Sequence, residues 1–184
     1  MKDHIVQVGD PVLRAVAKPV LKKDIGSRKL NAVIAKMKKL LDQEEFGVAI
    51  AAPQVGESLR LFVVAGRVFM PAADEEDGTR EVPPARVFIN PKITRLSRGK
   101  KEMSEGCLSV RDKYGSVMRH EKATVEALDE KGRPFIYHGS GLIGHIFQHE
   151  VDHLDGVLYI DKTVTLEEDE GFKKLGERRR KGDK

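Results

Sequence analysis

The order of the predicted elements places this chain in the α+β class. One amphipathic helix comes early, several β-rich segments follow, and a second helix lies late in the chain. Helices and strands segregated in this way favour antiparallel or mixed β-sheets packed around a helix, rather than alternating parallel units. A length of 184 residues suits one domain. We therefore expect residues 1–184 to form a single domain that ends in a basic tail, from about residue 166 to residue 184.

The first helix is predicted to run from Asp24 or Ser27 to about Leu41. The two polar residues are candidate N-caps, and Gly47 lies beyond the end of the helix. Apolar residues recur at helical spacing with lysines between them, and they are Leu30, Val33, Ile34, Met37, Leu40 and Leu41. This N-terminal amphipathic helix is expected to pack on the core, and we assign it no chemical role.

Segments rich in β-branched and aromatic residues predict the strands. They are residues 60–66, 85–96, 123–128, 134–138 and 157–160. The turn sequence "DEKGR" separates the third segment from the fourth and predicts that they form a hairpin. The acidic stretch 71–84 contains proline and glycine and is predicted to be a loop.

The second helix, "LIGHIFQHEVDHL", follows Ser140 and Gly141, and Gly156 is its expected stop. Its apolar residues indicate that it is buried, and they are Leu142, Ile143, Ile146 and Leu154. A buried helix that also carries several polar side chains is where we look for chemistry.

Two histidines on this helix are spaced to share a metal ion. His149 and His153 are four residues apart and project from the same face. Glu150 lies about 100° around the helix from His149, beside such an ion but poorly placed to ligate it. In this H-E-x-x-H arrangement the glutamate is the general base toward water that the metal activates. Burying these three side chains without a function would be costly, so we prefer a central metal-binding helix to a solvated polar one.

The third ligand is less certain from the helix alone. Cys107, the single cysteine, could fill the core, act as a nucleophile or ligate a metal. A thiolate with two imidazoles gives a three-ligand catalytic site with one open position. Glu167, Glu168 and Glu170 remain alternatives, although they read as a solvated run, and Asp155 points off the histidine face.

A neighbouring histidine is expected to have another role. His145 lies one turn before His149, and it is eight residues, or about 12 Å along the axis, from His153. That separation is awkward for three ligands on one ion, so we expect His145 to line the adjacent pocket.

Charge and hydropathy bound the compartment and the partners. The net charge of +4 is concentrated near the end, where residues 173–184 hold seven basic residues and two acidic ones. Such a tail suits a ribosomal or nucleic-acid surface, although a solvated end is commoner. No apolar run is long enough to span a bilayer, and the N-terminus lacks the apolar region of a secretory signal. We expect a cytoplasmic protein with no membrane or DNA partner.

Three stretches together resemble the signature motifs of the bacterial-type peptide deformylase family. They are "GVAIAAPQVG" (47–56), "EGCLSV" (105–110) and "QHEVDHLDG" (148–156), and they match in order and spacing. The resemblance also takes in "GDPVLR" and "VFINP" and covers roughly residues 6–160. It implies hydrolysis of the formyl amide on the N-terminal formyl-methionine of nascent polypeptides, with release of formate.

The resemblance also implies a set of residue roles. Cys107, His149 and His153 would hold one divalent ion, ferrous iron (Fe2+) in the family, with Zn2+, Ni2+ or Co2+ as substitutes. Glu150 would be the general base and then the proton donor to the departing amine. The side-chain amide of Gln54 and the backbone N–H of Leu108 would stabilise the oxyanion, as amide hydrolysis requires.

Further residues follow from the matched positions. Glu105 and Gln148 would orient the ligands, or Glu105 would instead pair with Arg119. The implied substrate-binding residues, which contact an N-formylmethionyl peptide, are Gly47, Val48, Ala49, Met103, Glu105, Gly106, Arg119, Leu142, His145 and Ile146. Two of these depart from the usual pattern, because Ala49 replaces a glycine of the first motif and His145 is a polar member of the methionine pocket. We expect them to affect substrate approach and side-chain preference.

Two other functions fit parts of the sequence. A general metallopeptidase would use the same helix with a different third ligand, but no histidine follows His153. A catalytically weakened, deformylase-like ribosome-binding protein would account for the basic tail and for Ala49.

Overall fold

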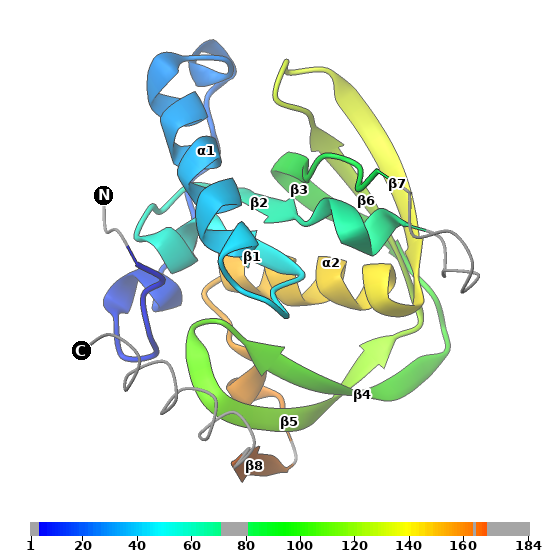
Figure 1. Cartoon of the computed structure of the whole chain (residues 1–184). Helices are drawn as coiled ribbons and strands as arrows, with labels where there is room; N and C mark the ends of the chain where they lie inside the picture. Colours follow the sequence, from blue (N-terminus) through cyan, green and yellow to red (C-terminus); the bar gives the residue numbers. More distant parts are fainter. Residues whose placement is uncertain (1–3, 71–80, 164, 169–184) are drawn as a thin grey trace.

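The computed structural model describes residues 4–70, 81–163 and 165–168, and it confirms the α+β class (Figure 1). Within these residues, five strands form one antiparallel sheet in the order β1-β2-β3-β6-β7, and three form a second in the order β4-β5-β8. The first sheet comprises β1 (Ala49–Ala51), β2 (Leu61–Val64), β3 (Arg86–Leu96), β6 (Lys122–Leu128) and β7 (Pro134–Ser140). The second comprises β4 (Lys100–Cys107), β5 (Val110–His120) and β8 (Leu166–Glu168).

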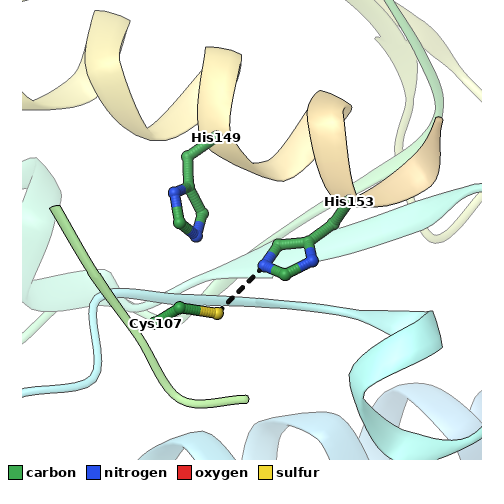
Figure 2. Close-up of side chains that lie close together, drawn as sticks. All are labelled: Cys107, His149 and His153. Carbon is green, nitrogen blue, oxygen red and sulfur yellow. Dashed lines mark hydrogen bonds between the residues drawn. The ribbon is translucent and has the colours of Figure 1, made fainter. Parts of the chain in front are cut away.

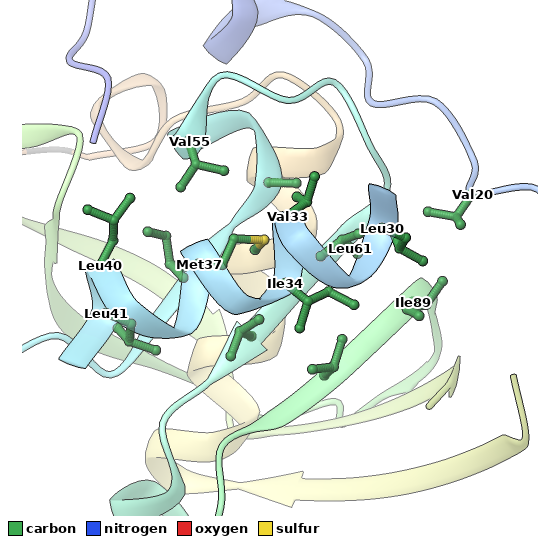
Figure 3. Close-up of a cluster of buried hydrophobic side chains, with 14 of the residues drawn as sticks. Val20, Leu30, Val33, Ile34, Met37, Leu40, Leu41, Val55, Leu61 and Ile89 are labelled. Carbon is green, nitrogen blue, oxygen red and sulfur yellow. The ribbon is translucent and has the colours of Figure 1, made fainter. Parts of the chain in front are cut away.

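The early helix, α1 (Arg28–Asp42), forms where its apolar spacing predicts. Ser27 is its N-cap, and the Ser27 hydroxyl accepts a hydrogen bond of 3.2 Å from the backbone N–H of Leu30. All six apolar residues of the predicted stripe are buried. They pack with Val55, Leu61 and Ile89 in one core cluster (Figure 3). The amphipathic pattern alone therefore located this helix and its inner face.

The first sheet is covered on both faces, as the alternation along β2 shows. Leu61 and Val63 join the cluster under α1, whereas Phe62 and Val64 join the cluster under α2 (Gly141–Leu154). Successive side chains of a strand point to opposite faces, so α1 and α2 lie on opposite sides of the sheet. The other side of α2 faces the hairpin of β4 and β5 (Figure 1). The late helix is thus enclosed between the two sheets.

The end of α2 depends on a glycine at the predicted stop. Gly156 has a φ of +75°, in the left-handed region, and directly follows the C-cap Asp155. A Cβ at this position would lie 2.5 Å from the carbonyl oxygen of Arg14. Asp155 pairs with Arg60 at 2.7 Å, which ties the helix end to the start of β2. Neither described helix is both long and apolar enough to cross a membrane.

Three segments differ from the sequence predictions. The predicted strand 157–160 is wrong, because Tyr159–Asp161 forms a 3-10 turn in which the buried Tyr159 donates its hydroxyl to the carbonyl of Lys113. The hairpin of β4 and β5 was not predicted, since its many charged residues interrupt any β-rich pattern. Residues 166–168 of the expected tail form β8, while 169–184 and residues 71–80 of the expected loop lie outside the described residues.

We predict that Phe88→Ala lowers the free energy of unfolding by about 3–5 kcal/mol. Phe88 is fully buried. Its ring centroid lies 4.7 Å from that of Phe62, on which it stacks, and 5.2 Å from that of Phe147. Truncation therefore leaves a cavity where β3 meets α2. Urea denaturation measures the change. Ile136→Ala is the control, because Ile136 is 58% exposed on β7 and should change stability by less than about 0.5 kcal/mol. Equal losses in both variants would contradict this account of the core.

Candidate metal and catalytic site

Three metal-ligating side chains from two elements converge beneath α2. Cys107 is the last residue of β4, and His149 and His153 come from the inner face of α2 (Figure 2). One ligand atom from each lies within 4.8 Å of the other two, and Cys107 Sγ is 3.2 Å from His153 Nε2. The alternative acids Glu167 and Glu168 lie in β8, paired with β5, and neither belongs to this cluster. Glu170 lies outside the described residues.

The donor set fits a divalent transition-metal ion. One sulfur and two imidazole nitrogens suit Fe2+, Zn2+, Co2+ or Ni2+ better than Mg2+ or Ca2+, which prefer oxygen. The sulfur of Cys107 also receives the backbone N–H of Ser109 at 3.4 Å and the Gln54 amide at 3.5 Å. These two donors and His153 hold the sulfur in place beside the histidines.

The two histidines differ in their affinity for protons. Burial lowers the pKa of His153 well below its ordinary value, so this ring is neutral, as ligation requires. Burial also opposes a charge on His149, but contacts with Cys107 and Glu105 outweigh it and raise the pKa of that ring. Metal binding to His149 therefore competes with a proton.

Glu105 is the buried carboxylate that organises the cluster. It accepts hydrogen bonds from His149 Nδ1 at 2.8 Å and from His145 Nε2 at 2.7 Å. Arg119 donates to both carboxylate oxygens, through Nε at 2.5 Å and Nη2 at 3.0 Å. Burial opposes the ionisation of Glu105, but these hydrogen bonds outweigh it and hold the pKa of the carboxyl well below its usual range. With Nδ1 of His149 bound to Glu105, Nε2 is the ring atom left to face the cluster.

The charge network extends from Glu105 to the surface. Arg119 also pairs with Asp152 at 2.6 Å, and Asp152 pairs with the partly exposed Lys162 at 2.6 Å. The pairing of Glu105 with Arg119, which the sequence left as an alternative, is therefore present together with the contact to His149. Both interactions fit one carboxylate because it has two oxygens.

Glu150 lies beside the cluster with an unused oxygen. The residue is 3% exposed, and its Oε2 has no hydrogen-bond partner among the described residues. Burial raises the pKa of Glu150 to about 7, and the charge of Glu105 adds to the effect while His149 opposes it. A carboxyl with a pKa near neutrality can accept a proton and return it in one cycle.

Gln54 is held by its amide oxygen so that its nitrogen faces the cluster. Its Oε1 accepts the backbone N–H of Ala51 at 2.8 Å, and its Nε2 donates to Ser109 Oγ at 3.2 Å and toward Cys107. This contact set assigns the amide orientation. The nitrogen is therefore a donor directed at the cluster.

A cavity of about 570 Å3 opens on the cluster, within the usual range for ligand sites. Its walls include the expected residues Gly47, Val48, Ala49, Met103, Glu105, Gly106, Leu142, His145 and Ile146, together with Gln54, Leu108, Cys107, His149 and Glu150. Arg119 is not among the lining residues, and its expected contact with a substrate stays a prediction. The guanidinium is 4% exposed and is taken up by Glu105 and Asp152.

Sequence reasoning assigned one residue wrongly and missed others. The Gln148 amide bonds to the backbone of His120 and Gly144, so it joins α2 to β5 rather than orienting a ligand. Ser109 and Asp152, which support Gln54 and Arg119, were not singled out, although both lie within the quoted motifs. The outer cavity wall also includes Phe46, Arg111 and Tyr114, for which the sequence carried no signal because they come from a loop and an unpredicted hairpin.

A sequence model of one family, polypeptide deformylase, matches residues 2–169. The chain belongs to the peptide deformylase family. This confirms the resemblance in the sequence motifs, and with it the interpretation of the chain as a hydrolase that removes the N-formyl group from nascent polypeptides. The ribosome-binding alternative without catalysis is not favoured.

Individual relatives agree over nearly the whole length. The chain is 41% identical to a peptide deformylase of Halothermothrix orenii over 166 residues, which are 90% of this chain and 96% of the relative. A peptide deformylase structure from Legionella pneumophila aligns with a TM-score of 0.72 and 36% identity, covering 97% of this chain and 92% of that one. The Met-Ala-Ser-bound class I type b enzyme of Acinetobacter baumannii aligns with a TM-score of 0.75 and 32% identity, covering 88% of this chain and 98% of that one.

We predict that Arg119→Met lowers the free energy of unfolding by about 3–5 kcal/mol, because it leaves the carboxylate of Glu105 buried without its cation. Chemical denaturation measures the loss. The matched control is Arg133→Met, since the Arg133 side chain is 70% exposed in its pair with Asp129 and exposed pairs contribute little. A loss in Arg119→Met no larger than in the control would contradict the structural role of the buried pair.

Proposed function

We propose that this enzyme hydrolyses the formyl amide of N-formylmethionyl peptides with Cys107, His149 and His153 as ligands to one divalent ion. The observation that carries the proposal is the convergence of these three side chains beside a cavity that Cys107, His149 and Glu150 line. The ion, Fe2+ by family resemblance, supplies Lewis-acid activation of water and of the formyl oxygen. Zn2+, Ni2+ or Co2+ would fit the same ligands.

Glu150 is the residue that moves the proton. A water adds to the formyl carbon and gives a proton to the free oxygen of Glu150, which is buried and unpartnered among the described residues. The carbon–nitrogen bond then breaks, Glu150 passes the proton to the departing amine, and formate leaves. Because its pKa lies near 7, the carboxyl can both accept and return this proton.

Gln54 and Leu108 stabilise the negative charge that develops on the formyl oxygen. The Gln54 amide is held against the cluster by Ala51 and Ser109, so little reorganisation is needed when the charge forms. Leu108 directly follows Cys107 and lines the same cavity, so its backbone N–H would be the second donor to this oxygen.

The cavity wall accounts for binding of the first residue. Val48, Met103, Leu142 and Ile146 offer an apolar surface beside the cluster, which suits a methionine side chain. Ala49 is 6% exposed and contributes a methyl group to the same wall. The substrate class points to a cytoplasmic enzyme that meets its peptides at the ribosome. Binding of the ribosome by basic residues 173–184 stays a prediction, since they lie outside the described residues.

We predict that Glu150→Gln lowers formate release from formyl-Met-Ala-Ser by about 100-fold to 10,000-fold, because the variant keeps the shape of the side chain but cannot carry the proton. Formate is measured on anaerobically purified enzyme. Bound metal, measured in the same samples, should stay close to one ion per chain, which separates loss of the base from loss of the ion. Formate release close to that of the unaltered enzyme would contradict the role of Glu150.

We predict that Cys107→Ala loses bound metal and formate release together, because two imidazoles remain from a three-ligand set. Elemental analysis of the purified variant checks this. The same experiment tests the general metallopeptidase alternative, in which another residue is the third ligand. A Cys107→Ala protein that retains its ion and cuts unformylated peptides internally would favour that alternative.

A further inference from the structure

His145 is a polar side chain in the wall that otherwise binds the substrate side chain through apolar contacts. It lies on the same face of α2 as Leu142, Ile146 and His149, and all four line the cavity. Its side chain is 10% exposed. One helical turn, about 6 Å, separates it from the ligand His149. A substrate side chain of three or four atoms, attached next to the formyl amide, reaches this level of the helix.

The contact with Glu105 determines which nitrogen of His145 carries a proton. Arg119 donates to both oxygens of Glu105, so the carboxylate is the acceptor and Nε2 of His145, at 2.7 Å, is the donor. In the neutral ring Nδ1 is then an acceptor. Nδ1 has no hydrogen bond to any described residue. Because His145 lines the cavity and its Nε2 is held by Glu105, a neutral ring would offer one fixed acceptor, Nδ1, to a ligand there.

Methionine cannot use that acceptor, because a thioether has no hydrogen to donate. Glutamine has nearly the same length and shape but ends in an amide that donates two hydrogens. Norleucine is the corresponding apolar chain. A cavity lined only by apolar side chains would disfavour glutamine strongly, since its amide would be buried without partners.

We propose that His145 sets the side-chain specificity of this enzyme, with its Nδ1 accepting a hydrogen bond from the first residue, so that formyl-glutaminyl peptides are substrates beside formyl-methionyl ones. The inference rests on the proposed function and widens the range of substrates. The first residue of the substrate would carry an unbranched side chain of methionine length, which is either apolar or ends in a hydrogen-bond donor. Because Glu105 occupies Nε2 of His145, the ring can only accept a hydrogen bond from the substrate side chain, so it favours side chains that donate one.

The test compares kcat/KM for formyl-Met-Ala-Ser, formyl-Gln-Ala-Ser and formyl-norleucyl-Ala-Ser, all measured at one mildly alkaline pH. The variants are His145→Leu, His145→Phe and His145→Gln. Ratios between substrates within one preparation do not depend on how much of the protein is folded or metal-loaded. The Gln-to-Met ratio is kcat/KM for formyl-Gln-Ala-Ser divided by kcat/KM for formyl-Met-Ala-Ser. We expect this ratio to fall about fivefold in the Leu and Phe variants, because one net hydrogen bond contributes about that factor. The norleucine-to-Met ratio should stay within about twofold.

Two further measurements separate recognition from a structural effect. His145→Gln keeps an amide that can donate to Glu105 and an oxygen that can accept, so it should retain most of the Gln-to-Met ratio. Calorimetric binding of the product peptides Gln-Ala-Ser and Met-Ala-Ser should show the same order without turnover. The control His138→Leu removes an exposed histidine of β7 outside the cavity and should leave every ratio unchanged.

The outcomes distinguish this inference from the proposed function. If the unaltered enzyme releases no formate from formyl-Met-Ala-Ser, the proposed function fails. If it does, but its Gln-to-Met ratio equals that of both His145→Leu and His145→Phe, only the role of His145 is overturned. A fall of equal size in His138→Leu would overturn it as well.

Discussion

The carboxylate of Glu105 is the interaction on which the rest of the site depends. It comes from β4, and its four donors come from α2 and β5, so one buried group joins three elements. Burial makes the arrangement all-or-none, because removing the carboxylate would leave several donors without water or protein partners. Cys107 lies two residues further along β4. The same contact that orients His149 therefore also places the sulfur beneath α2.

The position of α2 between two sheets explains how a buried helix can be so polar. Its apolar residues, such as Phe147 and Leu154, pack on the first sheet, while its histidines and Glu150 face the hairpin of β4 and β5. Close approach to β7 requires small residues, because a Cβ at Gly144 would lie 3.0 Å from the carbonyl oxygen of Gly139. Glu105 of the second sheet accepts hydrogen bonds from His145 and His149 on this polar face, whereas Oε2 of Glu150 has no partner among the described residues.

Sequence patterns predicted the elements whose side chains meet an apolar core. The stripe of α1 and the β6–β7 hairpin follow directly from periodicity and turn chemistry. The hairpin of β4 and β5 was not predicted because its backbone ladder and the buried pair of Glu105 with Arg119 leave no alternating hydrophobic pattern in the sequence. Residues 157–160 looked like a strand because Leu158 and Tyr159 are buried, but they pack beneath a 3-10 turn.

The sequence by itself determined the family, the two helices, and the pair of histidines with their glutamate, because a four-residue spacing on a helix is a local property. The tertiary structure decided what lies far apart along the chain. It brought Cys107 to the histidines, paired Arg119 with Glu105, and placed Gln148 on the backbone of β5. These contacts join residues that are distant in the sequence, so they form only when the two sheets pack around α2. A local sequence pattern cannot show which charged side chain a buried residue will pair with.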